Sequence, residues 1–250
     1  MFPDDCIQSI IGSANWWTKN NEKKLCRGAL IIAFAPHVDQ VPYALEPVGR
    51  TDASRHDSAI LRVVPLSVNQ PPGKTDLPVA AMPHSDGEVW AAYRAKKRPC
   101  LVIGSTNPAV DQALTGGMPK NSTSPTVLVA PYYGVDKDSR RAGYQPDFVE
   151  RVRHCEYPQF VWDRLPIGGG PDESILRLDH LQPIGALNNS YKLSEFKLSD
   201  DALKIIDELV HWLIWGKVDA DGLIALYRQE IEATFASKAD VGANVPSLPV

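Results

Sequence analysis

Proline and glycine recur along the whole of this chain. Its 250 residues include 21 Pro and 17 Gly, spread out rather than gathered into one linker. Short apolar runs rich in β-branched residues lie between them, which favours many strands joined by turns. Continuously apolar runs such as Thr126–Ala130 are typical of strands that are buried on both faces or that line a barrel. The predicted strands are Ala29–Ala35, Ala44–Val48, Ala59–Leu66, Glu88–Arg94, Cys100–Gly104, Thr126–Ala130, Gln159–Trp162 and Ser174–Leu178.

Two segments near the C-terminus have helical spacing instead. Over residues 200–215 the apolar side chains recur every three or four positions; Ser199 fits an N-cap and Gly216 follows the end. A second helix is predicted from Ala220 or Asp221 to Phe235. The sequence therefore predicts a mainly β, overall α+β protein with C-terminal helices.

Composition limits the class of protein. Apolar residues make up 44% of the chain and charged residues 22%, as in ordinary globular proteins. No apolar run approaches the roughly 18 residues that a membrane span needs. The N-terminus lacks a basic region that leads into a long apolar one, so we expect no secretory signal, no membrane contact and a cytoplasmic location.

Cysteine and histidine spacing gives no sign of a metal site. The four cysteines form no C-x-x-C pair, and the six histidines form no H-x-x-x-H or H-E-x-x-H pair. We therefore predict neither a metal nor another cofactor. The net charge of −4 argues against an indiscriminate nucleic-acid binder, but it is compatible with a local basic cleft.

A cluster of positive charge precedes one of the apolar runs. Arg94, Lys96, Lys97 and Arg98 lie within five residues, and Pro99 then restricts the backbone. A guanidinium held at the start of a buried strand can clamp a phosphate and stabilise a charged phosphoryl transition state. The alternative is a solvated basic turn that only maintains solubility.

Five short motifs follow one another along the chain. They are Gly87-Glu88-Val89-Trp90, Arg98–Ile103, Thr126–Pro131, Asp172–Leu181, and Leu198-Ser199 at the start of a terminal helix. In order and spacing they resemble the PemK/MazF family of toxin ribonucleases, over roughly residues 86–216. The resemblance implies an SH3-like β-barrel closed by a C-terminal helix. It places a barrel domain at residues 83–216, after a β-rich extension of unknown role (1–82) and before a C-terminal helix and tail (217–250).

The resemblance also implies a function. Members of this family are metal-independent endoribonucleases that act on single-stranded RNA, usually as homodimers restrained by an antitoxin. Arg98 matches the family's catalytic arginine and would stabilise the charged phosphorane. His84 is the titratable residue best placed in the sequence to assist it. The predicted substrate-binding residues are Arg94, Lys96, Lys97, Tyr132, Arg140 and Arg141.

One motif departs from the family pattern. Many members carry a Thr or Ser after the third strand, where this chain has Pro131–Gly134. Tyr133 would assist catalysis through its phenol or stack on a base, unless Tyr132 and Tyr133 are ordinary packing. Further on, Asp179 and His180 follow a strand, where Asp179 would orient Arg98 or a neighbouring strand. The departure leaves a second function open, a catalytically inactive module of the same fold that binds nucleic acid or a protein partner.

Overall fold

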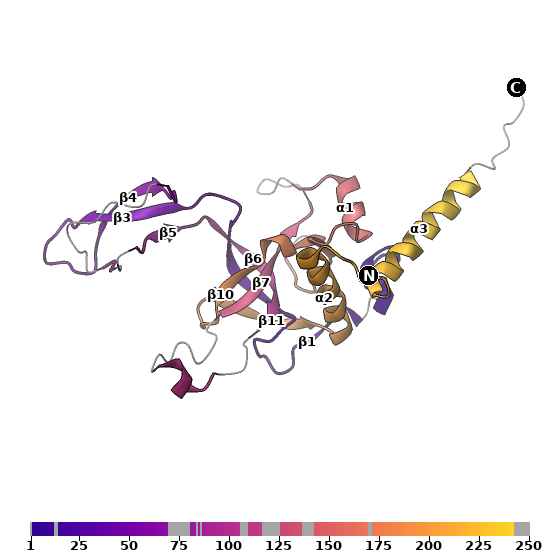
Figure 1. Ribbon diagram of the computed structural model, residues 1–250, viewed down its shortest axis with the longest axis horizontal. Helices are drawn as coiled ribbons and strands as arrows, with labels where there is room; N and C mark the ends of the chain where they lie inside the picture. The colour runs from indigo at the N-terminus through magenta and orange to yellow at the C-terminus, as the bar shows by residue number, and fades with distance from the viewer. Residues whose placement is uncertain are drawn as a thin grey trace, which may run out of the picture. The chain divides into compact units, whose positions relative to one another are not determined.

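The larger of two sheets joins strands that lie far apart in the sequence. In the computed structural model its order is β1–β11–β2–β6–β7–β9–β8, and β10 also pairs with β7 (Figure 1). Its neighbours pair antiparallel wherever their register is described. The strands are β1 (Trp17–Lys19), β2 (Ala29–Pro36), β6 (Ala95–Gly104), β7 (Thr126–Gly134), β8 (Phe160–Asp163), β9 (Ser174–Arg177), β10 (Gln182–Gly185) and β11 (Tyr191–Leu198).

The chain divides into two compact units. The large unit comprises residues 1–33 and 97–250, and the small unit comprises residues 34–96. The predicted domains (1–82, 83–216 and 217–250) have other limits and stay a prediction. The structure describes residues 2–12, 15–69, 81–83, 85, 87–105, 110–116, 126–136, 143–169 and 172–242.

The three α-helices of the described residues belong to the large unit. They are α1 (Pro146–Arg153), α2 (Asp200–Trp215) and α3 (Leu223–Gly242). Helix α2 has the predicted bounds: the Ser199 hydroxyl accepts a hydrogen bond from the Ala202 amide at 3.1 Å, and Gly216 ends the helix with a left-handed backbone. No helix among the described residues is long and apolar enough to cross a membrane.

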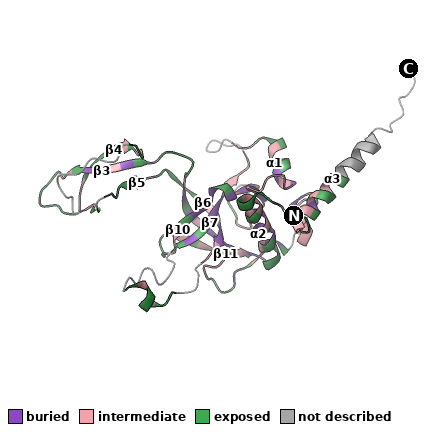
Figure 2. Cartoon of the chain, viewed as in Figure 1, coloured by how far each residue is buried: buried purple, intermediate pink, exposed green. Residues whose placement is uncertain are grey.

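The core of the large unit lies between its sheet and helix α2. The buried side chains of α2, Ile205, Ile206 and Leu209 among them, pack in one cluster with Leu30 of β2 and Leu101 of β6. Figure 2 shows this burial as purple segments in β6, β7 and α2. Residues 29–31 of β2 and 100–103 of β6 are buried. Their burial explains why these stretches of sequence are continuously apolar.

Side chains connect the two end strands of the large sheet. The indole nitrogens of Trp16 and Trp17 donate hydrogen bonds to the Asp163 carboxylate on β8, at 3.2 and 3.1 Å, and Tyr132 donates a third at 2.9 Å. The fold is mixed α+β, with mostly antiparallel sheets. No closed barrel is found in the described part of the chain. The predicted α+β class is thereby confirmed.

The small unit contains a three-stranded antiparallel sheet. Strand β3 (Tyr43–Gly49) lies between β4 (Ile60–Pro65) and β5 (Trp90–Ala92). Within these three strands only Ala44 and Pro47 are buried, and Figure 2 shows them mainly as exposed and intermediate residues. This sheet therefore has very little core of its own.

Candidate functional site

Arg98 lies against the aromatic ring of Tyr133. Strands β6 and β7 pair with Cys100 opposite Pro131. Continued by two residues, this register places Arg98 opposite Tyr133 on the same face of the sheet. The guanidinium carbon of Arg98 is 3.9 Å from the centroid of the Tyr133 ring, a close cation–π contact. The structure therefore brings together two of the three residues that the sequence predicts as catalytic.

Tyr133 also contacts His180. The Tyr133 hydroxyl lies 2.8 Å from His180 Nδ1, and Arg177 Nη2 lies 2.9 Å from His180 Nε2. Because a guanidinium only donates, Nε2 has to accept and Nδ1 carries the hydrogen of a neutral ring. In this arrangement His180 donates a hydrogen bond to the Tyr133 oxygen. We call Arg98, Tyr133, Arg177, Asp179 and His180 the Arg98 cluster.

Arg177 is held by a carboxylate. Its guanidinium donates two hydrogen bonds to Asp179, at 2.7 and 2.6 Å. Burial lowers the pKa of Arg177, but hydrogen bonds to Asp179 and Tyr144 raise it by a larger amount. The pKa of Arg177 therefore lies above its ordinary value. The same guanidinium lies 5.0 Å from the ring centroid of Phe160 and 5.5 Å from that of Tyr133. Arginine and aromatic side chains thus alternate across β6, β7, β9 and β8.

Arg98 differs from Arg177 in its charge balance. In the described part of the chain no carboxylate forms an ion pair with Arg98, and its buried Nε atom has no hydrogen-bond partner. Other arginines of the large unit pair with carboxylates, for example Arg164 with Glu173 at 3.0 Å and Arg153 with Asp5 at 2.8 Å. The Arg98 charge is therefore stabilised by the face of an aromatic ring and not by an anion. This leaves the Arg98 guanidinium suited to binding an anion.

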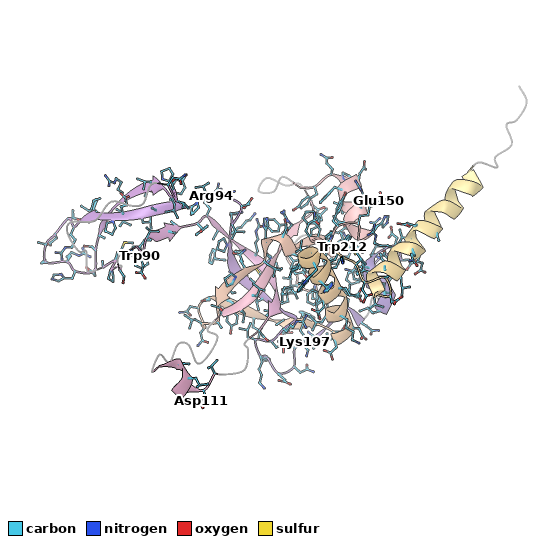
Figure 3. All side chains as sticks on the ribbon, in the orientation of Figure 1. Trp90, Arg94, Asp111, Glu150, Lys197 and Trp212 are labelled. Carbon is cyan, nitrogen blue, oxygen red and sulfur yellow. The ribbon has the colours of Figure 1, made fainter. Side chains whose placement is uncertain are left out.

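The other predicted binding residues do not all join this cluster. Lys97 alternates with Arg98 and points to the opposite face of β6, while Lys96 shares the face of Arg98 but belongs to the small unit. Arg94 also lies in the small unit (Figure 3), where it lines a pocket of about 100 Å³ together with Tyr43. His84, Arg140 and Arg141 lie outside the described residues.

Tyr132 and Tyr133 have different environments. Tyr132 is 3% exposed and donates to Asp163, so it has the packing role that the sequence left open for it. Burial and the nearby carboxylate raise the pKa of Tyr132 well above its ordinary value. Tyr133, on the other face of β7, is only partly buried and joins the Arg98 cluster.

The sequence did not identify Arg177 or His180 as site residues. Arg177 occupies the position two residues after Ile175, which pairs with Tyr133, so strand alternation places it on the Tyr133 face. His180 follows in a short 3₁₀ turn, η5 (Leu178–His180), that ends β9. The alternation of side chains along β9 would have placed Arg177 beside Tyr133 if the pairing of β7 with β9 had been known from the sequence.

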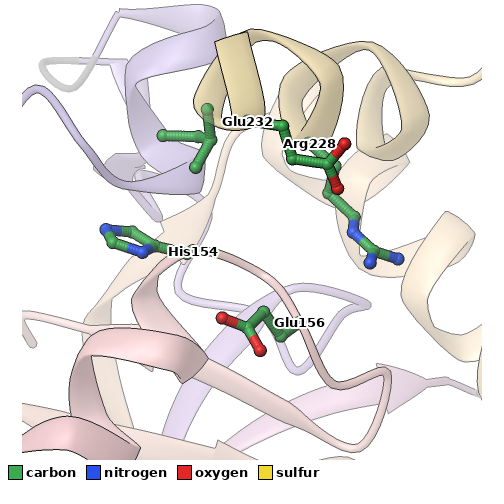
Figure 4. A pocket seen from close by; sticks show the side chains of 5 residues that line it. His154, Glu156, Arg228 and Glu232 are labelled. Carbon is green, nitrogen blue, oxygen red and sulfur yellow. The ribbon is translucent and has the colours of Figure 1, made fainter. Parts of the chain in front are cut away.

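A separate pocket lies between the end of α1 and helix α3. Its volume is about 210 Å³, and it is lined by His154, Glu156, Arg228, Ile231 and Glu232 (Figure 4). None of these residues belongs to the Arg98 cluster. Among the described residues, no three His, Cys, Asp or Glu side chains gather as ligands for a metal ion.

Comparison with known proteins provides no relative from which a function could be transferred. No protein-family model matches the chain, and no curated protein matches it significantly. The similarity to PemK/MazF ribonucleases rests on the sequence motifs alone.

Proposed function

We propose that the chain is a metal-independent endoribonuclease of the toxin–antitoxin type, which acts on single-stranded RNA at the Arg98 cluster. The observation that carries the proposal is the Arg98 guanidinium, stacked on Tyr133 and without a carboxylate partner among the described residues. A phosphate that approaches Arg98 would meet an uncompensated cation beside a phenol. Both groups stabilise negative charge on phosphate oxygens.

The proposed reaction is attack of a ribose 2′-oxygen on the adjacent phosphorus. The bond from the 2′-oxygen to phosphorus forms, the bond to the 5′-oxygen breaks, and that oxygen gains a proton while the 2′-hydroxyl loses one. Arg98 would stabilise the phosphorane charge, and Tyr133 would donate a hydrogen bond to a phosphate oxygen. His180 would position the Tyr133 hydroxyl, at 2.8 Å. His84 remains the titratable residue that the sequence predicts to assist Arg98.

The fold and partners implied by the family belong to the same proposal. The hydrogen bonds from Trp16 and Trp17 to Asp163 bring the ends of the large sheet together, which supports an SH3-like barrel that is closed by side chains. A homodimer and an antitoxin partner are implied by the resemblance, and a cytoplasmic location is proposed with them.

An RNA cleavage assay in EDTA tests the proposal. The wild-type chain should cut a labelled single-stranded RNA, and Arg98→Ala should reduce the rate at least about 100-fold, the usual effect of losing a transition-state donor. Arg27→Ala is the matched control, because Arg27 lies in the same unit and binds Asp207 and the Ile103 carbonyl outside the cluster. It should change the rate less than about twofold. Intact RNA at high wild-type concentration would refute cleavage.

A binding module without catalysis is the second candidate. It is favoured by His180, whose two ring nitrogens are both engaged, so that this ring offers no free base in the observed geometry. In this case the wild-type chain should bind single-stranded RNA without cutting it, and more weakly as salt rises. Arg98→Ala should reduce the slope of log affinity against log salt by about one, as expected for one lost phosphate contact. An unchanged slope would exclude Arg98 from the interface.

A further inference from the structure

The pocket of the small unit shares no residue with the Arg98 cluster. Its volume is about 100 Å³, and two stretches of chain line it, residues 37–43 at the start of β3 and residues 93–94 after β5. The His37 amide donates a hydrogen bond to the Arg94 carbonyl oxygen at 2.8 Å, and Tyr43 pairs with Ala92, directly before Tyr93. Backbone contacts therefore hold the two sides of the pocket together.

Two tyrosine side chains line this pocket, one from each stretch. Tyr43 is 46% exposed and Tyr93 is 48% exposed. The ring contacts of the described residues include neither of them. A half-exposed aromatic ring without an aromatic neighbour retains a surface on which another flat ring can stack.

Arg94 gives the pocket a positive charge. Among the described residues Arg94 forms no ion pair, whereas Arg55 pairs with Asp57 at 3.6 Å and Arg62 with Glu46 at 2.7 Å in the same unit. No carboxylate belongs to the described residues that line the pocket. The Arg94 guanidinium can therefore hold a phosphate through two parallel hydrogen bonds.

Gln40 supplies the neutral polar group of the pocket. Its side-chain amide can donate and accept hydrogen bonds at once, as the edge of a nucleobase does. The pocket is also small, since sites for drug-sized ligands have about 300–1,000 Å³. Its size therefore favours a ligand with a single flat ring over one with a large fused ring system.

We propose that this pocket binds a pyrimidine nucleotide. The base stacks on Tyr93 or Tyr43, its edge bonds with the Gln40 amide, and its phosphate pairs with Arg94. A cation alone would accept any anion, and a tyrosine alone any flat ring. Their combination in one small pocket requires a ligand that carries both a ring and an anion.

The same chemistry occurs in a free nucleotide and in one nucleotide of a single-stranded RNA. Neither source depends on cleavage at the Arg98 cluster, so the proposal does not rest on the proposed function. To keep the two sites apart, every measurement uses the full chain with Arg98→Ala.

Nuclear magnetic resonance titration with uridine 5′-monophosphate tests the site. The nucleotide should shift the amide signals of Tyr93 and Arg94 saturably, and uridine, which lacks the phosphate, should bind at least about tenfold more weakly. Arg94→Ala should remove this difference between the two ligands. Tyr93→Leu should instead weaken both ligands by a similar factor of at least about five, because it removes a stacking surface that both use.

Two variants outside the pocket are the matched controls. Arg62→Ala removes an exposed arginine, and Trp90→Leu removes an exposed aromatic ring, from the same unit. Each should leave the affinity for uridine 5′-monophosphate within about twofold. The amide spectrum of each variant also shows whether it is folded.

Three results would overturn the proposal. The first is the absence of saturable shifts at Tyr93 and Arg94 up to about 10 mM uridine 5′-monophosphate, the weak limit for a specific site. The second is an equal loss of nucleotide and uridine binding in Arg94→Ala. The third is displacement of the nucleotide by an equal concentration of inorganic phosphate, which would mean a plain anion site.

A short oligouridine distinguishes the two sources of the ligand. If it shifts the same amide signals at lower concentration than the mononucleotide, the pocket binds RNA. If the mononucleotide shifts them and the oligouridine does not, the pocket binds a free nucleotide. Either result supports the nucleotide site.

Discussion

The large and small units use similar apolar strands with opposite results. In the large unit the Cys100–Ile103 run of β6 is buried, because helix α2 and the core around it cover the sheet. In the small unit Leu61 and Val63 lie on strand β4, and both are exposed. The comparison shows that an apolar strand becomes core only where a second layer is available. Otherwise such residues stay exposed to water.

The largest expected contrast is between a buried residue of the large unit and an exposed residue of the small sheet. Leu101→Ala, at a fully buried site, should lower the free energy of unfolding by about 3–5 kcal/mol. Val63→Ala, at an exposed site of the small sheet, should change it by less than about 0.5 kcal/mol at low protein concentration. Urea unfolding followed at 222 nm reports on the large unit, which contains α1, α2 and α3. Similar losses for both variants would break the comparison.

The buried Asp163 should give the large unit a pH dependence. Burial raises the pKa of Asp163 from 3.8 to about 6, although Trp16, Trp17 and Tyr132 donate hydrogen bonds that lower it. A raised pKa means that the fold favours the protonated form. The contribution of protonated Asp163 to the free energy of unfolding is therefore complete below pH 3.8, and it is lost as the pH rises through about 6. The total loss is roughly 3 kcal/mol.

Asp163→Asn separates this effect from other titrations. The variant should lack the fall in the free energy of unfolding between about pH 4 and 6. At neutral pH the lost oxygen acceptor should cost about 1–3 kcal/mol, but the variant also avoids the roughly 3 kcal/mol that ionisation of Asp163 costs, so its free energy of unfolding should lie within about 2 kcal/mol of the wild type. Parallel urea titrations across this pH range measure both quantities. Identical pH slopes in the two proteins would contradict the assignment to Asp163.

A smaller contrast concerns hydroxyl side chains at chain turns. Ser199→Ala removes the cap of α2 and should cost about 1 kcal/mol, since one helix amide loses its acceptor. Ser58→Ala in the small unit loses only an exposed bond to the Arg55 carbonyl. It should have an effect below about 0.3 kcal/mol. Thermal unfolding by circular dichroism compares the two, and a larger effect at Ser58 would reverse the expected order.

The smallest expected effect is that of the ion pair in the small sheet. Glu46→Gln removes the charge that pairs with Arg62, whose side chain is 66% exposed. Because an exposed pair contributes little, the free energy of unfolding should fall by less than about 0.5 kcal/mol. Urea unfolding measures this change, and a loss above about 1 kcal/mol would contradict the expectation for an exposed pair.

Elements with strong local patterns were predictable. The α2 bounds and its Ser199 cap match the prediction, and strands β2, β3 and β4 lie where their apolar runs indicated. Strand β11 was missed because polar and charged residues alternate with apolar ones in it, whereas the prediction relied on runs of apolar residues. Helix α1 was missed because its eight residues include a proline and several charges.

The site could be predicted only in part. Arg98 and Tyr133 were named from the basic cluster and the family resemblance, and their contact at 3.9 Å agrees with their being placed in one site. Arg177 and His180 could not be added from sequence, because they join Tyr133 through the pairing of β7 with β9, about 40 residues away along the chain. Separation along the sequence carries no signal of which strands become neighbours.

The amino-acid sequence by itself determined the local elements: where apolar runs form strands, where α2 begins and ends, and which cations lie next to Pro99. Only the tertiary structure decided which of these strands are covered, that Trp17 of one end strand and the preceding Trp16 meet Asp163 of the other end strand, and that Arg98 has a ring rather than a carboxylate beside it. The physical reason is the separation along the chain over which each interaction acts. Helix hydrogen bonds, capping and side-chain alternation act between residues that are close in the chain, whereas strand pairing, burial and charge balance depend on segments that meet only after folding.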